Sequence, residues 1–170
     1  MVPTIVICGS GSGTGKSTIA GRLHTLLERR GVDLHCWYET DVLTDPSFVP
    51  FMERFRAGDP AMDLALRAAF EAFLRRETAA EAAFVSESLV PFVRWLILGL
   101  VPPDRIRGFC DWVAESLAYR QPTLVVLRCD RDAAIDRAKK ERGPAWFEQN
   151  QKRSRRYPLF RRRPDLDPWS

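Results

Sequence analysis

The feature that most constrains the fold is a glycine-rich run, CGSGSGTGKST, which occupies residues 8–18. An apolar segment over residues 4–8 precedes it, and an amphipathic helical pattern follows it from about Ser17 to Arg30. A strand, a glycine loop ending in Gly-Lys-Ser and a helix are together the context of a phosphate-binding loop. The glycines let backbone N–H groups turn inward around phosphate oxygens, and the helix directs its positive end at them.

Within this loop, Lys16 is expected to reach the β- and γ-phosphates of a nucleotide, and the Ser17 hydroxyl is expected to ligate Mg²⁺. The pattern G-x-x-x-x-G-K-[ST] has its first glycine where this chain has Ser10, and Gly9 comes one residue early. Either the serine adopts the first-turn conformation, or the loop is one residue longer. A Gly/Ser-rich turn that binds nothing is the alternative, but such turns rarely end in Gly-Lys-Ser-Thr between a strand and a helix. The predicted nucleotide-binding residues of the loop are Gly11, Ser12, Gly13, Thr14, Gly15, Lys16, Ser17 and Thr18.

Length and composition are those of one globular domain, which we expect to span residues 1–170. Apolar residues make up 45% of the chain and charged residues 28%, which is ordinary for such a domain. The N-terminus runs straight into the first apolar segment, so no signal or transit peptide is expected. The most apolar stretch, residues 89–101, is too short to span a bilayer and is expected to form a buried helix.

Cysteine and histidine positions argue against a metal centre built from these residues. None of the cysteines has a C-x-x-C spacing, and His24 and His35 are isolated in the sequence. We therefore expect reduced core thiols in a cytoplasmic protein that does not contact a membrane. The four cysteines are Cys8, Cys36, Cys110 and Cys129.

The positive charge of the chain gathers at its C-terminus. The formal net charge is +4, and residues 143–170 hold seven Lys or Arg against three Asp or Glu, a difference that equals the whole excess. A basic tail over about residues 152–170 suits an anionic substrate or a nucleic acid. A solvated surface segment explains most of these arginines better, so a nucleic-acid partner is not expected.

Hydrophobic periodicity predicts alternating strands and helices. Because a strand that follows a crossover helix lies parallel in the same sheet, this order predicts an α/β fold with a mostly parallel sheet. No convincing fifth strand follows residue 144, so we expect about four to five strands and a tail from Ser154 that is extended, ligand-ordered or irregularly docked. The predicted strands cover residues 4–8, 32–38, 83–87 and 122–129, and the predicted helices cover about 17–30, 48–55, 61–78, 88–99, 103–119, 131–142 and 145–152.

The chain resembles the P-loop kinases that phosphorylate small molecules, namely nucleoside and nucleotide kinases with shikimate, gluconate and chloramphenicol kinases as relatives. The resemblance covers the order of elements from Thr4 to Lys152 and is specific only at the phosphate loop. It implies a three-layer P-loop NTPase fold, with helices on both faces of a short sheet. It also implies an enzyme that uses ATP and Mg²⁺ to move a γ-phosphoryl group to a hydroxyl or phosphate of a small metabolite.

Acids follow the second and third predicted strands, at the edge where such sheets bind ligands. In related kinases an acid after the second strand takes the proton of the acceptor hydroxyl, which here implies Glu39 or Asp41 as the general base. Capping of the next turn is the alternative role for either one. Glu87 resembles the acidic turn of nucleoside and thymidylate kinases and is implied to hold Mg²⁺, with capping of the next helix as its alternative. Ser88 stands where those kinases have an arginine, which departs from their pattern of sugar recognition.

Basic residues after the fourth strand resemble the lid of these kinases, which closes arginines over the transferred phosphoryl group. The resemblance implies a lid over about residues 130–143, with Arg137 as a catalytic residue and Arg131 and Arg142 as nucleotide ligands. Arginine suits this role because its planar fork matches phosphate oxygens and stays charged. A solvated helix face is the alternative for each of these residues taken singly.

Three functions remain open at this point. A nucleoside, a nucleotide or a similar hydroxylated metabolite is the expected acceptor, and the helical segment from Asp45 to Ala80 would wall its pocket with Phe48, Phe51 and Phe55 unless these rings form core. The same chemistry on an antibiotic or secondary metabolite is the first alternative. A nucleotide-dependent switch or nucleic-acid-associated NTPase is the second, although the sequence has no N-K-x-D motif and no strong run of apolar residues ending in Asp-Glu. The sequence allows a homodimer but does not define the oligomeric state.

Overall fold

The computed structural model of the chain describes residues 4–9, 11–79, 82–87 and 91–168. Its four strands form one parallel sheet in the order β2-β3-β1-β4. The predicted α/β fold with a short parallel sheet is therefore confirmed, and each predicted strand is found within a few residues of its expected place. The strands are β1 (Thr4–Gly9), β2 (Leu34–Trp37), β3 (Ala83–Ser86) and β4 (Thr123–Leu127).

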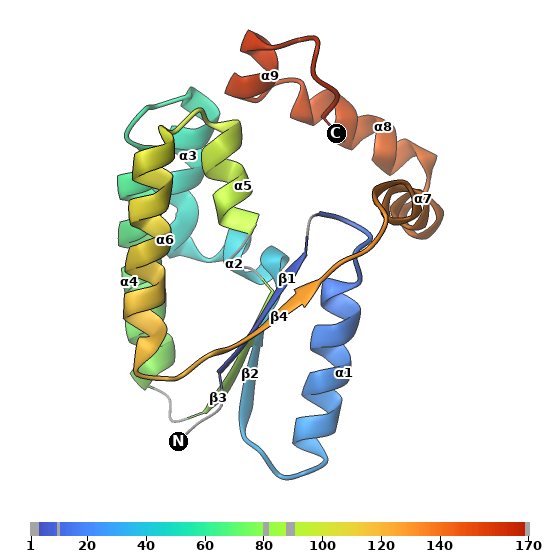
Figure 1. Cartoon of the computed structure of the whole chain (residues 1–170). Helices are drawn as coiled ribbons and strands as arrows, with labels where there is room; N and C mark the ends of the chain where they lie inside the picture. The colour runs from blue at the N-terminus through green and yellow to red at the C-terminus, as the bar shows by residue number, and fades with distance from the viewer. Residues whose placement is uncertain (1–3, 10, 80–81, 88–90, 169–170) are drawn as a thin grey trace.

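Helices cover both faces of this sheet and its carboxyl edge (Figure 1). The first helix, α1 (Lys16–Glu28), lies on one face. On the other face lie α3 (Val49–Ala57), α4 (Met62–Ala79), α5 (Pro91–Leu98) and α6 (Pro103–Ala118). Beyond the carboxyl ends of the strands lie α7 (Arg131–Arg142), α8 (Pro144–Ser154) and α9 (Pro158–Arg162).

The parallel register brings the ends of all four strands to one edge. Val6 of β1 pairs with Ser86 of β3, and Cys8 pairs with Val126 of β4. Trp37 of β2 pairs with Ser86 in turn. Since ligands of such sheets bind outside the carboxyl ends of the strands, the loops after β1, β2, β3 and β4 can meet around one site.

A cluster of aromatic rings forms the core between the sheet and the helical layer. Phe48 stacks on Phe92 with ring centroids 5.2 Å apart and meets Phe70 edge-on at 5.3 Å. Phe51 and Phe55 are also almost completely buried. The three phenylalanines that were expected to wall an acceptor pocket, or else to form core, therefore belong to the core.

Two short helices were not predicted. The first, α2 (Glu39–Thr44), follows β2 directly, and Asp41 begins it by accepting a hydrogen bond from the backbone N–H of Tyr38 at 3.1 Å. This bond caps the helix from its third position, as in a capping box. The second is α9, which begins at Pro158, a residue whose fixed φ suits a first helical position.

The C-terminal segment is packed against the rest of the protein rather than extended. Phe160 of α9 is buried, and Tyr157 contacts Phe55 and Trp95, with ring centroids 5.1 Å and 5.8 Å away. Among the described residues no strand follows β4, so β4 forms an edge of the sheet. The C-terminal residues thus connect α7 to the helical layer instead of extending the sheet.

The expectation that the cysteines are core thiols needs correction. Cys110 is exposed and not part of the core, because its neighbour Phe109 takes the buried position on α6. Cys129 lies beyond the end of β4 and is only partly buried, so it is not a core thiol either. All four cysteines are free thiols. Ser10 and Ser88, on which two departures from family patterns depended, lie outside the described residues.

In the described part of the chain, no helix has the length and apolar character needed to cross a membrane.

Candidate functional site

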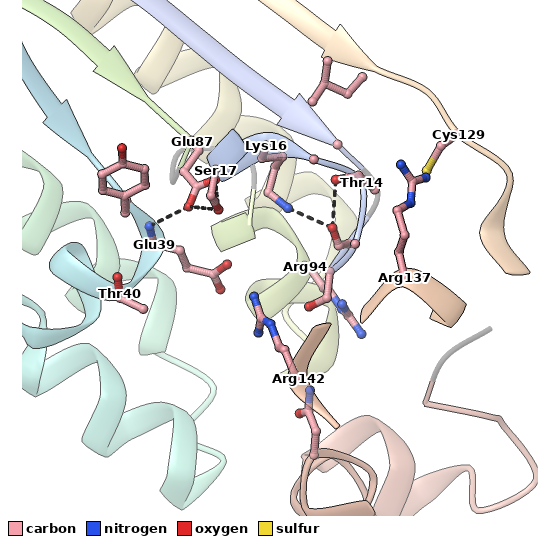
Figure 2. Close-up of a pocket in the computed structure, with 18 of the residues that line it drawn as sticks. Thr14, Lys16, Ser17, Glu39, Thr40, Glu87, Arg94, Cys129, Arg137 and Arg142 are labelled. Carbon is pink, nitrogen blue, oxygen red and sulfur yellow. Dashed lines mark hydrogen bonds between the residues drawn. The ribbon is translucent and has the colours of Figure 1, made fainter. Parts of the chain in front are cut away.

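A cavity of about 1240 Å³ opens at the carboxyl edge of the sheet (Figure 2). Its walls come from the phosphate loop, the start of α2, Glu87 after β3, one side of α5, the residues after β4, and parts of α7 and α8. Segments far apart in the sequence therefore face one space. The parallel sheet explains this, because every crossover returns the chain to the same edge.

The phosphate loop has the backbone shape that its glycines predict. Gly13 and Gly15 have φ values of 80° and 89°, a conformation that other residues rarely adopt. The Lys16 ammonium donates to the carbonyl oxygen of Gly11 at 2.9 Å, and the Thr14 hydroxyl donates to the same oxygen at 2.9 Å. Lys16 is buried and lines the cavity, so its charge faces the space enclosed by the loop.

The loop is also closely covered by α7. A β-carbon built on Gly13 would lie 2.0 Å from the backbone oxygen of Ala134 in α7. Only glycine allows these two backbones to approach so closely. A change at Gly13 must therefore displace either the loop or α7.

Ser17 and Glu87 meet at the base of the cavity. The Ser17 hydroxyl lies 2.8 Å and 3.0 Å from the two carboxylate oxygens of Glu87, to which it donates. Glu87 is only 4% exposed, and its backbone N–H donates to the carbonyl of Trp37 at 3.1 Å. A hydroxyl and a carboxylate beside a phosphate loop form a donor set that fits Mg²⁺, which prefers oxygen ligands and substrate phosphates.

This pair is not a closed metal cage. In the part of the chain that the structure describes, no group of three or more His, Cys, Asp or Glu side chains could hold a metal ion. A Mg²⁺ ion at Ser17 and Glu87 would therefore depend on phosphate oxygens and water for its other ligands, as this ion commonly does.

Glu39 and Asp41 have separate places. Glu39 lines the cavity, and its backbone N–H lies 3.4 Å from a Glu87 carboxylate oxygen. The Asp41 carboxylate turns back to cap α2 and does not line the cavity. The neighbouring Tyr38 lines it too, but a hydrogen bond with Cys36, together with burial, raises its pKa to about 12. Near neutral pH its phenol therefore stays protonated. Of the two acids predicted after β2, Glu39 is the one that lines the cavity.

The three predicted lid arginines are not equivalent. Arg137 and Arg142 line the cavity (Figure 2). The Arg142 guanidinium lies 4.7 Å from the ring centre of Trp146. Arg131 does not line the cavity. Its guanidinium instead lies 3.7 Å from Asp132 and 3.9 Å from Asp167.

Several cavity residues were not predicted to take part in a site. Arg94 of α5 and Arg153 of α8 add two cations, and Asn150 and Tyr157 add polar groups from the C-terminal segment. Arg94 carried a signal in the sequence, since it is a lone charge within an apolar helix pattern. The others carried none, because nothing in the sequence indicates that the C-terminal residues fold back over the site.

The side chains around the cavity favour an anionic ligand. Six cations face three acids, an excess of three positive charges. Such a concentration of charge in a cleft attracts polyanions. The cations are Lys16, Arg94, Arg128, Arg137, Arg142 and Arg153, and the acids are Glu39, Glu87 and Glu141.

No family model matches the chain, and no curated protein sequence matches it. Solved structures do share its fold. The crystal structure of APE1195 is similar over 91% of this chain and 75% of that chain, with a TM-score of 0.53 and 19% sequence identity. The structure of deoxyadenosine kinase from M. mycoides with bound dATP is similar over 84% of this chain and 72% of that chain, with a TM-score of 0.45 and 20% identity. The similarity thus extends over most of the chain at low identity, and it is a similarity of fold.

Proposed function

We propose that this protein is an ATP-dependent phosphotransferase that moves the γ-phosphoryl group to a hydroxyl or phosphate of a small metabolite. One observation carries the proposal. A phosphate loop with a buried lysine and a Ser17–Glu87 pair opens into the same cavity as the carboxylate of Glu39 and the guanidinium groups of the lid.

In this proposal, each side chain has a role set by its position. The loop N–H groups and Lys16 bind the β- and γ-phosphates, while Arg137 and Arg142 approach from the lid and stabilise the charge of the transferred group. Ser17 and Glu87 would hold Mg²⁺, which supplies charge neutralisation at the phosphates when it is bound. Arg131 would contribute only if it left its present acidic neighbours.

Glu39 is the proposed general base. A base must lie within hydrogen-bond reach of the acceptor hydroxyl, and Glu39 is the acid of the pair Glu39 and Asp41 that lines the cavity. Asp41 would act indirectly by capping α2, the helix on which Glu39 is the first residue. This division makes the two acids experimentally separable.

The acceptor that we propose first is nucleoside- or nucleotide-like. Trp95 and Tyr157 lie next to each other on the cavity wall, so aromatic rings are available to a planar base. The same rings would suit an aromatic antibiotic or secondary metabolite, which is the second candidate acceptor. The phosphate loop does not separate the two, since it contacts the donor rather than the acceptor.

The test is release of ADP from ATP across a panel of nucleosides, nucleotides, hydroxylated metabolites and antibiotics. Release that depends on one acceptor class, with the phosphorylated product seen by mass spectrometry, would support the proposal and identify the class. Lys16→Ala is the matched control and should abolish the reaction. Release that requires only RNA or DNA, with no phosphorylated product, would contradict a kinase and favour a nucleic-acid-associated NTPase.

A further inference from the structure

Arg94 is a charged residue on a helix that is otherwise built for the core. In α5, Phe92 and Leu96 are almost completely buried, and their positions two residues before and after Arg94 turn its side chain away from the core. This direction leads into the cavity, where Arg94 is one of the lining residues (Figure 2). The helix therefore presents a single guanidinium group to the site from a firmly packed element.

The guanidinium lies beside the outer turn of the phosphate loop. A β-carbon built on Gly11 would meet Arg94 Nη1 at 3.7 Å, which is ordinary van der Waals contact. Gly11 is also the residue whose carbonyl oxygen accepts the Lys16 ammonium. Because this lysine reaches the β- and γ-phosphates in phosphate loops, Gly11 marks the end of the loop nearest the transferred group.

The described residues orient the charge of Arg94 but do not neutralise it. Its Nη2 donates to the carbonyl oxygen of Pro168 at 3.3 Å, and Pro168 is itself buried. No acidic side chain among the described residues forms an ion pair with it. Within the described residues, one edge of the guanidinium is thus held by a neutral carbonyl of the C-terminal segment, and no acid neutralises its charge.

We propose that Arg94 is a further catalytic residue, which contacts the γ-phosphoryl oxygens from the helical layer while Arg137 and Arg142 approach from the lid. This inference rests on the proposed function. In the transfer, the acceptor oxygen forms a bond to the γ-phosphorus and the bond from that phosphorus to the β–γ bridging oxygen breaks. The electron pair stays on the terminal phosphate of ADP, and the proton of a hydroxyl acceptor moves to Glu39. Arg94 stabilises the charge on the three transferred oxygens, which its planar fork can bind in pairs.

The position on α5 has a consequence for how the site works. A lid arginine must be brought to the phosphates by closure, whereas Phe92 and Leu96 fix α5 in the core. A donor that is already in place costs no reorganisation when the reaction occurs. Arg94 should therefore matter more for the transition state than for binding of ADP.

The test compares binding of ADP with binding of ADP and aluminium fluoride, a mimic of the transferring phosphoryl group, by calorimetry in the presence of Mg²⁺. The full chain is used as wild type, Arg94→Ala, Arg94→Lys and Arg107→Ala. Arg107 is exposed on α6 and does not line the cavity, so its variant removes the same charge elsewhere. Circular dichroism confirms that each variant is folded.

We expect wild type and Arg107→Ala to bind the mimic much more tightly than ADP alone. Arg94→Ala should keep the affinity for ADP but lose about 100-fold in affinity for the mimic, as is typical when one donor to a transition-state charge is removed. Its kcat should fall by about the same factor while KM for ATP changes little. Arg94→Lys should lie between the two, since lysine keeps the charge without the fork.

The outcomes separate the two proposals. If Arg94→Ala gains as much affinity from aluminium fluoride as wild type does, the role of Arg94 is overturned and the kinase proposal stands. If wild type binds no nucleotide, or gains nothing from the mimic, the proposed function fails and the role of Arg94 fails with it. The proposed role of Arg94 would also be overturned if Arg94→Ala lost as much affinity for ADP as for the mimic. The contact would then stabilise the ground state and the transition state equally.

Discussion

On the face of the sheet that α1 covers, the core contains three buried residues, whereas the core on the other face contains nineteen within the described chain. Alternate residues of β1 serve the two sides, since Ile7 packs toward α1 while Val6 and Cys8 pack toward the helical layer. In α1, only Lys16 and Ala20 are buried. The buried residues of the thin face are Ile7, Ala20 and Val85.

This difference suggests that stability and chemistry have separate sources in the molecule. The thin face carries the phosphate loop, Lys16 and Ser17, which are the residues expected to bind phosphates and metal. The thick face carries most of the buried apolar area, and burial of apolar area is the main favourable term in folding. Substitutions on the thick face should therefore unfold the protein, while substitutions around the loop should impair the reaction in a folded protein.

The largest expected effect tests this asymmetry with one substitution made on both faces. Leu66 in α4 is completely buried, so Leu66→Ala should lower the free energy of unfolding by about 3–5 kcal/mol. Leu23 in α1 packs against the thin core but is only partly buried, so Leu23→Ala should cost less than half as much. Urea denaturation followed by circular dichroism gives both values. Equal losses would mean that the thin face contributes as much stability as the thick one.

The second effect is on the reaction, at the two acids after β2. Glu39→Gln should lower kcat about 100-fold, because it removes the proposed base without changing the shape of the side chain. Asp41→Asn should leave kcat close to that of wild type, since an amide oxygen can still accept the bond from the Tyr38 N–H. Neither variant should unfold the protein. The assignment of the base is wrong if Glu39→Gln keeps the full rate, or if Asp41→Asn is the slower of the two.

Much of the fold could be predicted from the sequence, because strong periodicity and clear end signals coincide. Strand β4 and helix α7 illustrate this: an apolar run leads to Asp130, which caps the helix by accepting from the Ala133 N–H at 2.9 Å, and Gly143 ends it. The glycine loop likewise defined where β1 stops and α1 begins. Local chemistry is decisive at such places, since caps and glycines act within a few residues.

The remaining features depend on long-range packing and could not be predicted. Glu39-Thr40-Asp41 was interpreted as a turn with two candidate bases, and only the structure shows that Asp41 turns back to begin α2. In the same way, Arg94 was noted only as a charge in an apolar stretch. Its position beside Gly11 depends on how α5 packs, 83 positions further along the chain than the loop, which no local pattern encodes.

The third effect concerns the contact between the phosphate loop, which belongs to the thin face, and α7. Gly13→Ala places a β-carbon 2.0 Å from the Ala134 backbone oxygen and keeps a positive φ, so the loop or α7 must move. Gly15→Ala is the matched control, since it has a similar φ but open space around the new carbon. This comparison variant should show the strain of a positive φ within the loop, about 1–3 kcal/mol, without a clash against α7. Gly13→Ala should weaken ATP binding, measured by calorimetry, more than Gly15→Ala does. Equal ATP affinities of the two variants would mean that α7 does not need to lie on the loop.

The smallest effect is a pH dependence on the thick face, at Asp45. Burial opposes ionisation of this carboxyl, but hydrogen bonds from the Ser47 hydroxyl and backbone N–H and the charge of Arg76 outweigh it and lower its pKa from 3.8. A carboxyl with a lowered pKa stabilises the folded state above its ordinary pKa of 3.8, and this contribution is lost as the pH falls below that value. Asp45→Asn keeps the cap that precedes Phe48 but removes the titration, so it should cost less than about 1 kcal/mol at pH 7.

Between pH 6 and pH 3, other carboxyls titrate alike in both proteins, so the difference in their free energies of unfolding isolates Asp45. That difference should begin to shrink once the pH falls below 3.8, toward the lowered pKa of Asp45, because the protonated carboxyl and the amide that replaces it are both uncharged. A constant difference across this range would mean that Asp45 does not stabilise the thick face through its charge. Because Asp45 and Arg76 lie beside the aromatic core and outside the cavity, kcat at pH 7 should be the same in both proteins.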